Sequence, residues 1–323
     1  MATKAFIDLV AECDNFPYDE QYASKFYKLY LPHDDRPHGY MLPEVVRKMP
    51  WTPSFRIDYD AHTVSLQDPS SSSHVDLTSF CNAELATTVN AAIDANLFAI
   101  IHGQHSEPFA ILGANNPIVH MERFAAPLFG IVMRGAHATA YTRSRATGEM
   151  KLWIPRRSPL MFTYPGKLDS TVAGGVRAGE GPLEAIVHEA AEEASLPEEL
   201  VRRDVRAAGT LTYMSETRAG YAQGAEVGLA APDCVYLYDL EVAEDVVLKP
   251  RDDEVKEFYL WGVEETKRAL LNEEFKTNSA VVMIDFFVRH GIITQENEKD
   301  YVEIIVRMHR KLPFPTTPRP HWH

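Results

Sequence analysis

The sequence predicts an α/β fold in which helices cover both faces of one curved, mixed sheet. Three observations support this prediction. Runs of strand-forming residues are dense from residue 128 onward, a glycine turn and an amphipathic helix follow, and further strands then alternate with helices. The expected strands are residues 128–133, 136–142, 150–155, 170–174, 209–214, 234–242 and 254–261, with a hairpin at 144–149, and the expected closing helices are residues 264–271, 277–290 and 300–312.

The central stretch is residues 174–196, GGVRAGEGPLEAIVHEAAEEASL. It opens with the glycine turn Gly174-Gly175. Pro182 suits the first turn of a helix, because proline lacks the N–H that would be left unsatisfied there. Apolar side chains recur at helical spacing and form one stripe, made of Leu183, Ile186, Val187, Ala190 and Ala194. We therefore expect an amphipathic helix here.

Three glutamates, Glu189, Glu192 and Glu193, project together beside this stripe, because residues three and four apart are neighbours on a helix. They repel one another, and they lie toward the negative end of the helix dipole. A solvated acidic face is one interpretation of such a run. A site for Mg²⁺ or Mn²⁺ is the other, since these cations prefer oxygen ligands and keep coordination positions for substrate phosphates.

The spacing of this stretch resembles the Nudix box, the motif of the Nudix hydrolases. Two positions depart from the motif: His188 replaces its arginine and Ser195 replaces its final glycine. In the family the arginine orients a metal-binding glutamate, and we expect His188 to donate to Glu192, one turn further on. The residues that match the motif at the required spacing are Gly174, Glu180, Glu189, Ala190, Glu192, Glu193 and Leu196.

A closer resemblance links most of the chain to fungal and plant Nudix proteins that carry an added N-terminal domain. Their Nudix part also occurs fused to thiamine pyrophosphokinase. The segments that resemble them are APLFGIVMRGAHATAY from Ala126, LWIPRRS from Leu152, TYPGKLDSTVAGGV from Thr163 and EAAEEASLPEEL from Glu189. The resemblance implies a Nudix α/β/α sandwich over residues 124–323 and an accessory α+β domain over residues 1–123.

The resemblance also implies the residues that act on a phosphoanhydride. Glu189, Glu192 and Glu193 would supply most of the metal ligands, and a carbonyl near Gly174 would add another. A further glutamate comes from a distant loop or strand in this family, and its candidates here are Glu254 and Glu257, of which we chose Glu257. The general base varies within the family, so Glu192, Glu193 and the distant glutamate all remain candidates, while His188 would orient them.

Basic and aromatic side chains near the predicted helix are candidates for binding the substrate. A guanidinium at a strand end suits phosphate, and an organic moiety needs an aromatic wall. Each of these side chains is also explained by ordinary surface exposure or packing. The candidates are Arg156, Arg157, Lys167, Arg177 and Tyr164, followed by Tyr213 and by Tyr221 in the long polar loop 215–228.

Composition excludes several partners. The chain has 323 residues and a net charge of -14, which argues against nucleic acid and anionic membranes as partners. Its three cysteines are far apart, as expected of buried thiols in a reducing compartment. The start, MATKAFIDLV, has one lysine and then an acid, unlike a signal or transit peptide. We therefore expect a cytoplasmic protein, with the nucleus as the alternative, and make no prediction of its oligomeric state.

The first 123 residues contain no nucleotide or metal motif. Residues 3–48 are expected to be mostly helical because aromatic and aliphatic side chains recur at helical spacing, and residues 42–49 form a short helix. Residues 55–58 and 63–67 predict a β-hairpin, and residues 84–99 a helix. His102 and His105 have the spacing of a metal pair but no acidic partner beside them, so we interpret them as surface histidines.

Together these features predict a Mg²⁺- or Mn²⁺-dependent hydrolase of a small phosphoanhydride. The resemblance implies thiamine diphosphate, above all in its oxidised or damaged forms, with the monophosphate and phosphate as products. Two alternatives stay open: a general hydrolase of nucleoside-diphosphate-linked compounds, and a non-catalytic binding protein that kept the fold.

Overall fold

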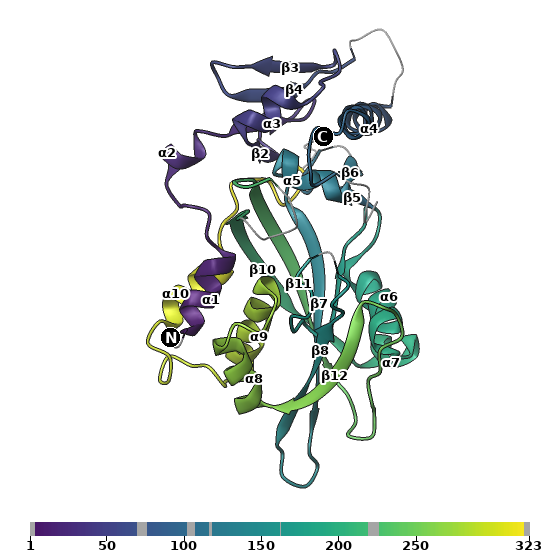
Figure 1. Ribbon diagram of the computed structural model, residues 1–323, viewed down its shortest axis with the longest axis vertical. Helices are drawn as coiled ribbons and strands as arrows, with labels where there is room; N and C mark the ends of the chain where they lie inside the picture. Colours follow the sequence, from purple (N-terminus) through teal and green to yellow (C-terminus); the bar gives the residue numbers. More distant parts are fainter. Residues whose placement is uncertain are drawn as a thin grey trace.

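A computed structural model describes residues 4–69, 76–101, 107–115, 118–161, 163–218 and 226–319. Its centre is a six-stranded mixed sheet in the order β10-β11-β7-β8-β12, with β9 on the same edge of β7 as β8 (Figure 1). Strands β11 and β7 are parallel, and the other pairs are antiparallel. The strands are β7 (Met133–Arg143), β8 (Met150–Arg157), β9 (Val172–Gly175), β10 (Val205–Glu216), β11 (Ala230–Glu241) and β12 (Val255–Gly262).

Strand β7 is shared between two partners along one edge. Its first half pairs with β9, where Ala136 lies opposite Gly174, and its last residues pair with β8, where Thr142 lies opposite Lys151. Strands β8 and β9 therefore diverge as they leave β7. This divergence places the start of the Nudix box beside, and not within, the β8–β12 part of the sheet.

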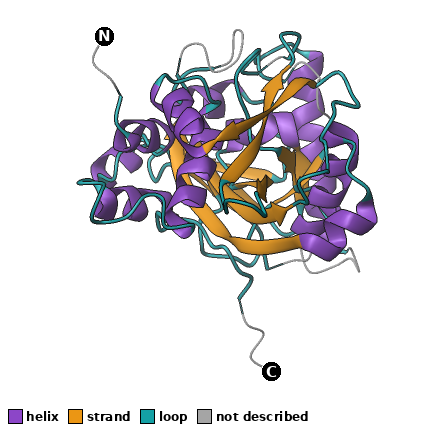
Figure 2. Ribbon diagram, turned by 90° about the horizontal axis from the view of Figure 1, so that it is seen from below, coloured by secondary structure: helices purple, strands orange, loops and turns teal. Residues whose placement is uncertain are grey.

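Helices cover both faces of the sheet, as predicted (Figure 2). Ala136, Ala138 and Ala140 of β7 face α6, and their small side chains allow the helix to approach closely. Tyr141 and Ile154 face the opposite side, where they share a core with four other helices. One face carries α6 (Pro182–Ala194) and α7 (Glu198–Asp204), and the other carries α1 (Phe6–Cys13), α8 (Val263–Leu271), α9 (Thr277–Arg289) and α10 (Tyr301–Met308).

The N-terminal layer lies at one end of the central sheet (Figure 1). A four-stranded sheet in the order β2-β1-β4-β3 and a two-stranded sheet of β5 and β6 share one core with α3 (Pro43–Lys48), α4 (Leu77–Asp94) and α5 (Ala126–Phe129). Two short helices, α2 (Glu20–Ala23) and η1 (Arg123–Ala125), complete it. The strands are β1 (Tyr27–Tyr30), β2 (Gly39–Met41), β3 (Phe55–Asp58), β4 (Thr63–Leu66), β5 (Pro108–Ala110) and β6 (His120–Glu122).

The prediction that residues 3–48 are mostly helical was wrong in its middle part. Residues Tyr27–Tyr30 form strand β1, which pairs with β2 on one side and β4 on the other. Tyr27 and Leu29 are buried while Lys28 and Tyr30 alternate with them. Aromatic side chains favour strands, and these four residues alternate between more and less buried positions, as strand residues do. This alternation outweighed the helical spacing of the longer segment. The short helix at 42–49 and the hairpin at 55–67 were predicted correctly.

Two further boundaries differ from the prediction. Residues 128–133 do not form a strand throughout: Pro127 lies in the first turn of the short helix α5, and Gly130 ends that helix in a left-handed conformation at φ 61°. Helix α4 starts at Leu77, seven residues before the predicted start, because the Asp76 side chain accepts a hydrogen bond from the Ser79 N–H and caps it.

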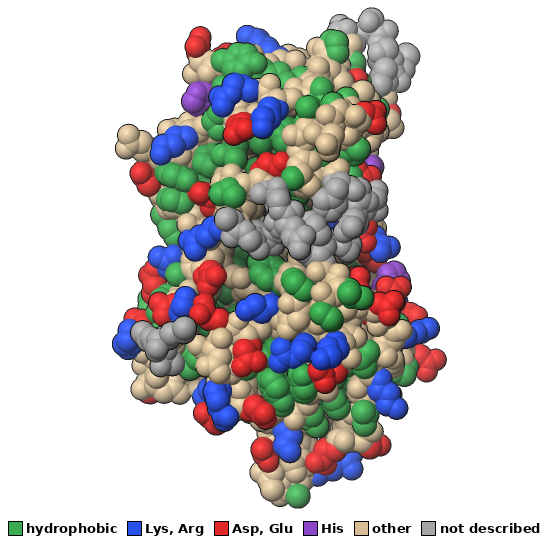
Figure 3. Space-filling view, viewed as in Figure 1, with side chains coloured by type: hydrophobic (Ala, Val, Ile, Leu, Met, Phe, Trp, Pro, Cys, Tyr) green, Lys and Arg blue, Asp and Glu red, His purple; other side chains and the backbone are tan. Residues whose placement is uncertain are grey.

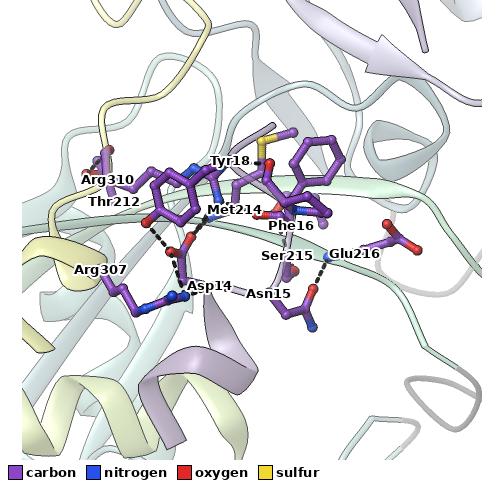
Figure 4. A network of polar contacts seen from close by, with 12 residues as sticks. Asp14, Asn15, Phe16, Tyr18, Thr212, Met214, Ser215, Glu216, Arg307 and Arg310 are labelled. Carbon is purple, nitrogen blue, oxygen red and sulfur yellow. Dashed lines mark hydrogen bonds and ion pairs between the residues drawn. The ribbon is translucent and has the colours of Figure 1, made fainter. Parts of the chain in front are cut away.

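Helix α1 belongs to the core of the central sheet, although the sequence assigned it to the accessory domain. The buried carboxylate of Asp14, just after α1, accepts hydrogen bonds from the Met214 N–H at 3.0 Å and from Arg310 Nη1 at 3.1 Å (Figure 4). Arg310 also donates to the Phe16 carbonyl at 2.6 Å and stacks on Tyr18. The division at residue 123 stays a prediction, and the chain crosses between the layers both before and after it.

Two global features bear on possible partners. None of the described helices combines the length and the apolar character needed to cross a membrane. On the face shown in Figure 3, acidic and basic side chains of the described residues are interspersed, without the continuous basic stripe that nucleic-acid binding uses.

Candidate active site

Helix α6 forms as predicted and carries the acidic residues. Pro182 occupies its first turn, and Ala185, Ile186, Val187, Ala190 and Ala194 are buried against the sheet. Ser195 ends the helix in the left-handed conformation at φ 55°. That conformation favours glycine, so a serine here costs about 1 kcal/mol. The sequence departure at this position therefore leaves the helix end in place.

Glu193 is the most buried of the three glutamates. Its residue is 7% exposed, and its carboxylate accepts a hydrogen bond from the Ala173 N–H of β9 at 3.1 Å. Burial raises the pKa of Glu193 well above its usual value, and the neighbouring carboxylates of Glu189 and Asp169 raise it further. Holding this group ionised therefore requires a positive charge that the surrounding side chains do not fully supply.

Glu189 lies against the glycine turn of the Nudix box. A Cβ atom added to Gly174 would overlap the Glu189 carboxylate, so only glycine leaves room for it. Burial raises the pKa of Glu189 to about 7, and the negative charges of Glu254, Glu192 and Glu107 contribute. Glu192 is exposed on the same side of the helix. Gly174, the half-buried Glu189 and the buried Glu193 thus lie together, and we call these three residues the acidic recess.

His188 does not contact Glu192 as expected. Its Nδ1 atom lies 2.9 Å from Oε1 of Glu180, the first glutamate of the Nudix box. His188 is on the exposed side of α6, whereas Glu180 is mostly buried in the loop that precedes the helix. The side chain at this position therefore ties the box loop to the helix, and the expectation was wrong because the loop folds back over the first turns of α6.

The two candidates for the distant glutamate occupy different surroundings. Glu257 of β12 pairs with Lys256 at 3.4 Å and has a lowered pKa, chiefly through a hydrogen bond with Tyr259. Glu254 precedes β12, and its negative charge raises the pKa values of both Glu189 and Glu193. Glu254 is thus the candidate whose charge acts on both Glu189 and Glu193, whereas Glu257 is not among the charges that raise their pKa values.

The basic candidates lie in three different settings. Arg156 donates to the Gly166 carbonyl at 2.9 Å and Lys167 to the Glu273 carbonyl at 2.6 Å, so both serve local structure. Arg157 points inward, where its Nη1 atom donates to Asp169 at 2.7 Å. Arg177 lies in the box loop and binds Glu107 through two nitrogens, at 2.9 and 3.2 Å.

The aromatic candidates lie away from the acidic recess. Tyr164, in a left-handed conformation at φ 50°, borders a cavity of about 140 Å³ formed with α1, α8 and α9. Tyr213 of β10 is buried in the core on the side of the sheet where β10 contacts α1 and α10. Tyr221, His102 and His105 lie outside the described residues, so the structure does not place them.

Two residues near the recess were missed by the sequence analysis. Glu107 bridges Arg177 and Arg123, with 3.1 Å between its Oε2 atom and Arg123 Nη1. Phe109 and Arg123 also lie next to Gly175, where a Cβ atom would collide with the Phe109 ring. These contacts join the N-terminal layer to the Nudix box. No local motif marks Glu107 or Arg123, because only the tertiary arrangement brings them to the box.

Fit to a divalent metal can be judged from the donors. Among the described residues, no three carboxylate, histidine or cysteine side chains are gathered as a complete metal site. The recess nevertheless provides buried carboxylate oxygens with raised pKa values and a glycine that leaves room beside them. Hard oxygen donors of this kind suit Mg²⁺ or Mn²⁺, whose charge would offset their repulsion.

Comparison with known proteins agrees with this geometry. Residues 133–281 match the family model of the NUDIX domain. The chain is 38% identical over 222 residues to uncharacterized protein YJR142W of Saccharomyces cerevisiae, covering 67% of this chain and 64% of that protein. It is 34% identical over 215 residues to Nudix hydrolase 20, chloroplastic, of Arabidopsis thaliana, covering 66% of this chain and 54% of that protein.

The chain thus spans less than two thirds of the length of either relative. Among solved structures, the C. elegans Ap4A hydrolase in a binary complex aligns with 50% of this chain and 100% of its own, at 15% identity and a TM-score of 0.35. That score carries no weight beside the family match. Residues 133–281 of this chain are thus similar to a NUDIX domain, and α6 lies at the position of the expected box helix.

Proposed function

We propose that the protein is a metal-dependent diphosphatase that cleaves a phosphoanhydride bond. The observation that carries the proposal is the pair of carboxylates beside the glycine turn, the half-buried Glu189 and the buried Glu193, both with raised pKa values. A buried acidic pair without a partner cation is costly to ionise, and functional sites are where such costs concentrate. The match to the NUDIX domain supports the same reaction class.

In this proposal Glu189, Glu192 and Glu193 hold the metal, together with the Gly174 carbonyl, and Glu254 replaces Glu257 as the distant ligand. The metal would neutralise charge on the diphosphate and acidify a water molecule. The Ala173 N–H orients the Glu193 carboxylate. The His188–Glu180 contact fixes the box loop against α6, so that Gly174 stays beside Glu189. Glu192, Glu193 and Glu254 remain the candidates for the general base.

For the substrate we propose thiamine diphosphate, above all its oxidised or damaged forms, which the enzyme would convert to the monophosphate and phosphate. The resemblance of the chain to the thiamine-linked Nudix proteins supports this choice. A general hydrolase of nucleoside-diphosphate-linked compounds is the second candidate, and a non-catalytic binder the third. We propose a small molecule as the partner, with neither nucleic acid nor membrane, and the cytoplasm as the compartment.

A phosphate-release screen tests the proposal. The full chain is assayed with Mg²⁺ and with Mn²⁺ against thiamine diphosphate, oxo-thiamine diphosphate, ADP-ribose, NADH and nucleoside triphosphates. We expect the highest kcat/KM for the oxidised thiamine diphosphate and no turnover in EDTA. A preference for a nucleotide would retain the chemistry and overturn the substrate. Absence of turnover on every compound, with binding of at least one, would favour the non-catalytic binder.

A further inference from the structure

A second polar cluster lies beside the acidic recess and is centred on Asp169, in the loop that leads into β9. The Asp169 carboxylate accepts three hydrogen bonds. The donors are Arg157 Nη1 at 2.7 Å, the backbone N–H of Ser170 at 2.8 Å and the hydroxyl of Ser279. The ammonium of Lys276, the residue before α9, lies 3.7 Å from the same carboxylate. This Asp169 cluster therefore contains two cations and one anion.

The backbone fixes Lys276 in this position. Its N–H donates to the Leu168 carbonyl at 2.8 Å, and the Leu168 N–H donates to the Glu274 carbonyl at 2.9 Å. The start of α9 is thereby joined to the residue just before Asp169. The side-chain ammonium keeps a looser contact, since 3.7 Å exceeds the usual length of a charge-assisted hydrogen bond. Lys276 is held close to Asp169 while its ammonium can still turn to another anion.

The cluster has more positive charge than its own carboxylate offsets. The side chains of Arg157 and Lys276 are only 10% and 19% exposed, so water compensates them poorly. The Nε atom of Arg157 is buried and has no hydrogen-bond partner among the described residues. Burial lowers the pKa of Lys276, and Arg157 and Arg123 lower it further, although Asp169 and Glu193 act in the opposite direction. The Lys276 charge also acts on the buried carboxyl of Asp233, whose pKa burial raises to about 7. An additional anion would relieve both groups.

The cluster adjoins the acidic recess on two sides. The loop from Asp169 runs into β9, whose Ala173 N–H binds Glu193. On the other side, the backbone N–H of Ser158, next to Arg157, donates to the Glu254 carbonyl at 2.7 Å. Cations therefore stand beside the carboxylates from two different elements. A diphosphate needs this arrangement, with metal ligands at one phosphate and fixed cations at the other.

We propose that Lys276 and Arg157 form a subsite that binds the terminal phosphate of the substrate. The proposal rests on the proposed diphosphatase function and adds Lys276, which has no place in the Nudix box. Arg156 and Lys167 do not compete for this role, because each donates to a backbone carbonyl on the outer side of the fold. Lys276 is the better residue to test, because Arg157 also supports the 163–169 loop through the Thr163 carbonyl.

Binding of inorganic phosphate to the metal-free full chain tests the subsite directly. Calorimetric titrations in EDTA compare the wild type with Lys276→Met, Lys276→Gln and Lys276→Arg. The matched control is Ser279→Ala, which removes a hydrogen bond to Asp169 but leaves both cations. Thermal unfolding checks that each variant folds. If Lys276→Met does not fold, Lys276→Gln takes its place in the comparison.

We expect phosphate affinity to fall about tenfold in the Met and Gln variants and to stay within about threefold of wild type in the Arg and Ala variants. With Mg²⁺ and the best substrate of the screen, KM should rise more than kcat falls. Equal affinity in all variants, or an equal loss in Ser279→Ala, would overturn the subsite. If the wild type hydrolyses diphosphates but the Lys276 variants bind phosphate as tightly as the wild type, only the subsite proposal is refuted. If the wild type hydrolyses no diphosphate, the proposed function is refuted.

Discussion

Glutamates on the two sides of helix α6 have pKa values that are shifted in opposite directions. Glu184, on the exposed side, binds Arg202 through both carboxylate oxygens, at 2.9 and 2.6 Å, and this contact lowers its pKa. Glu189, about one and a half turns further on, is turned into the fold, where burial raises its pKa to about 7. Among the described residues, neither Glu189 nor Glu193 forms an ion pair, whereas Glu184 does.

The proposed function explains this difference. Glu184 supports the structure, whereas Glu189 and Glu193 would bind a metal ion. A surface carboxylate paired with arginine needs nothing further, and its contribution to stability is small. Buried carboxylates that raise each other's pKa destabilise the fold unless a cation joins them. In the proposed function, the same residue type on the same helix thus has two roles, which differ with the side of the helix.

The sharpest test of the comparison replaces one acid from each side. Glu193→Gln should lower turnover by ~10²-fold or more, because losing a metal ligand removes charge neutralisation in the transition state. Glu192→Gln should have a similar effect. Glu184→Gln, the matched control, should stay close to wild type. Turnover measured at limiting Mg²⁺ decides between them, and near-normal rates in both Glu193→Gln and Glu192→Gln would refute the assignment.

The metal-free protein should respond to pH through Glu189. Its folded pKa of about 7 exceeds the ordinary value, so the folded state binds more protons than the unfolded state between about pH 4.5 and 7. Stability should therefore fall as pH rises through this window. Melting temperatures in EDTA should drop by a few degrees, and Glu189→Gln should flatten the profile. A melting temperature that rises with pH over this range in the wild type, but not in Glu189→Gln, would contradict the prediction.

Replacement of His188 tests the contact between helix and loop. Arginine keeps its charge at every physiological pH, whereas histidine is the residue whose charge generally changes there. His188→Arg, which places a permanent charge beside Glu180, should therefore hold or raise activity in a steady-state assay. The control is Glu180→Gln, which removes the partner. A folded but inactive arginine variant would mean that His188 acts in its own right.

The smallest effect is expected at the end of α6. Ser195→Gly should stabilise the protein by about 0.5–1 kcal/mol, because glycine adopts the left-handed conformation without strain. Turnover should not change, since both sides of the helix keep their residues. Denaturant unfolding at equilibrium measures the gain, and a loss of stability would show that the serine side chain makes a compensating contact.

Sequence reasoning worked where one segment determines its own structure. The spacing of Gly174, Pro182 and the apolar stripe predicted α6 and most of its buried side, although Leu183 of that stripe is exposed and Ala185 is buried. It failed where distant segments decide, as at β1, whose strand state depends on pairing with β2 and β4. The same limit applies to the site. Glu254 and Glu257 are equivalent in sequence, and Lys276 carries no motif. Only the folded chain shows that the charge of Glu254 acts on Glu189 and that the charge of Glu193 acts on Lys276.

Binding of Mn²⁺ to the full chain tests the central claim most directly. Electron paramagnetic resonance reports free Mn²⁺ during a titration at pH 8, without any assumption about the substrate. We predict that the wild type and Glu184→Gln bind Mn²⁺ equally, and that Glu189→Gln and Glu193→Gln each weaken binding by tenfold or more. Equal binding in all four proteins, or loss of binding in Glu184→Gln alone, would contradict the assignment of the metal site to the buried side of α6.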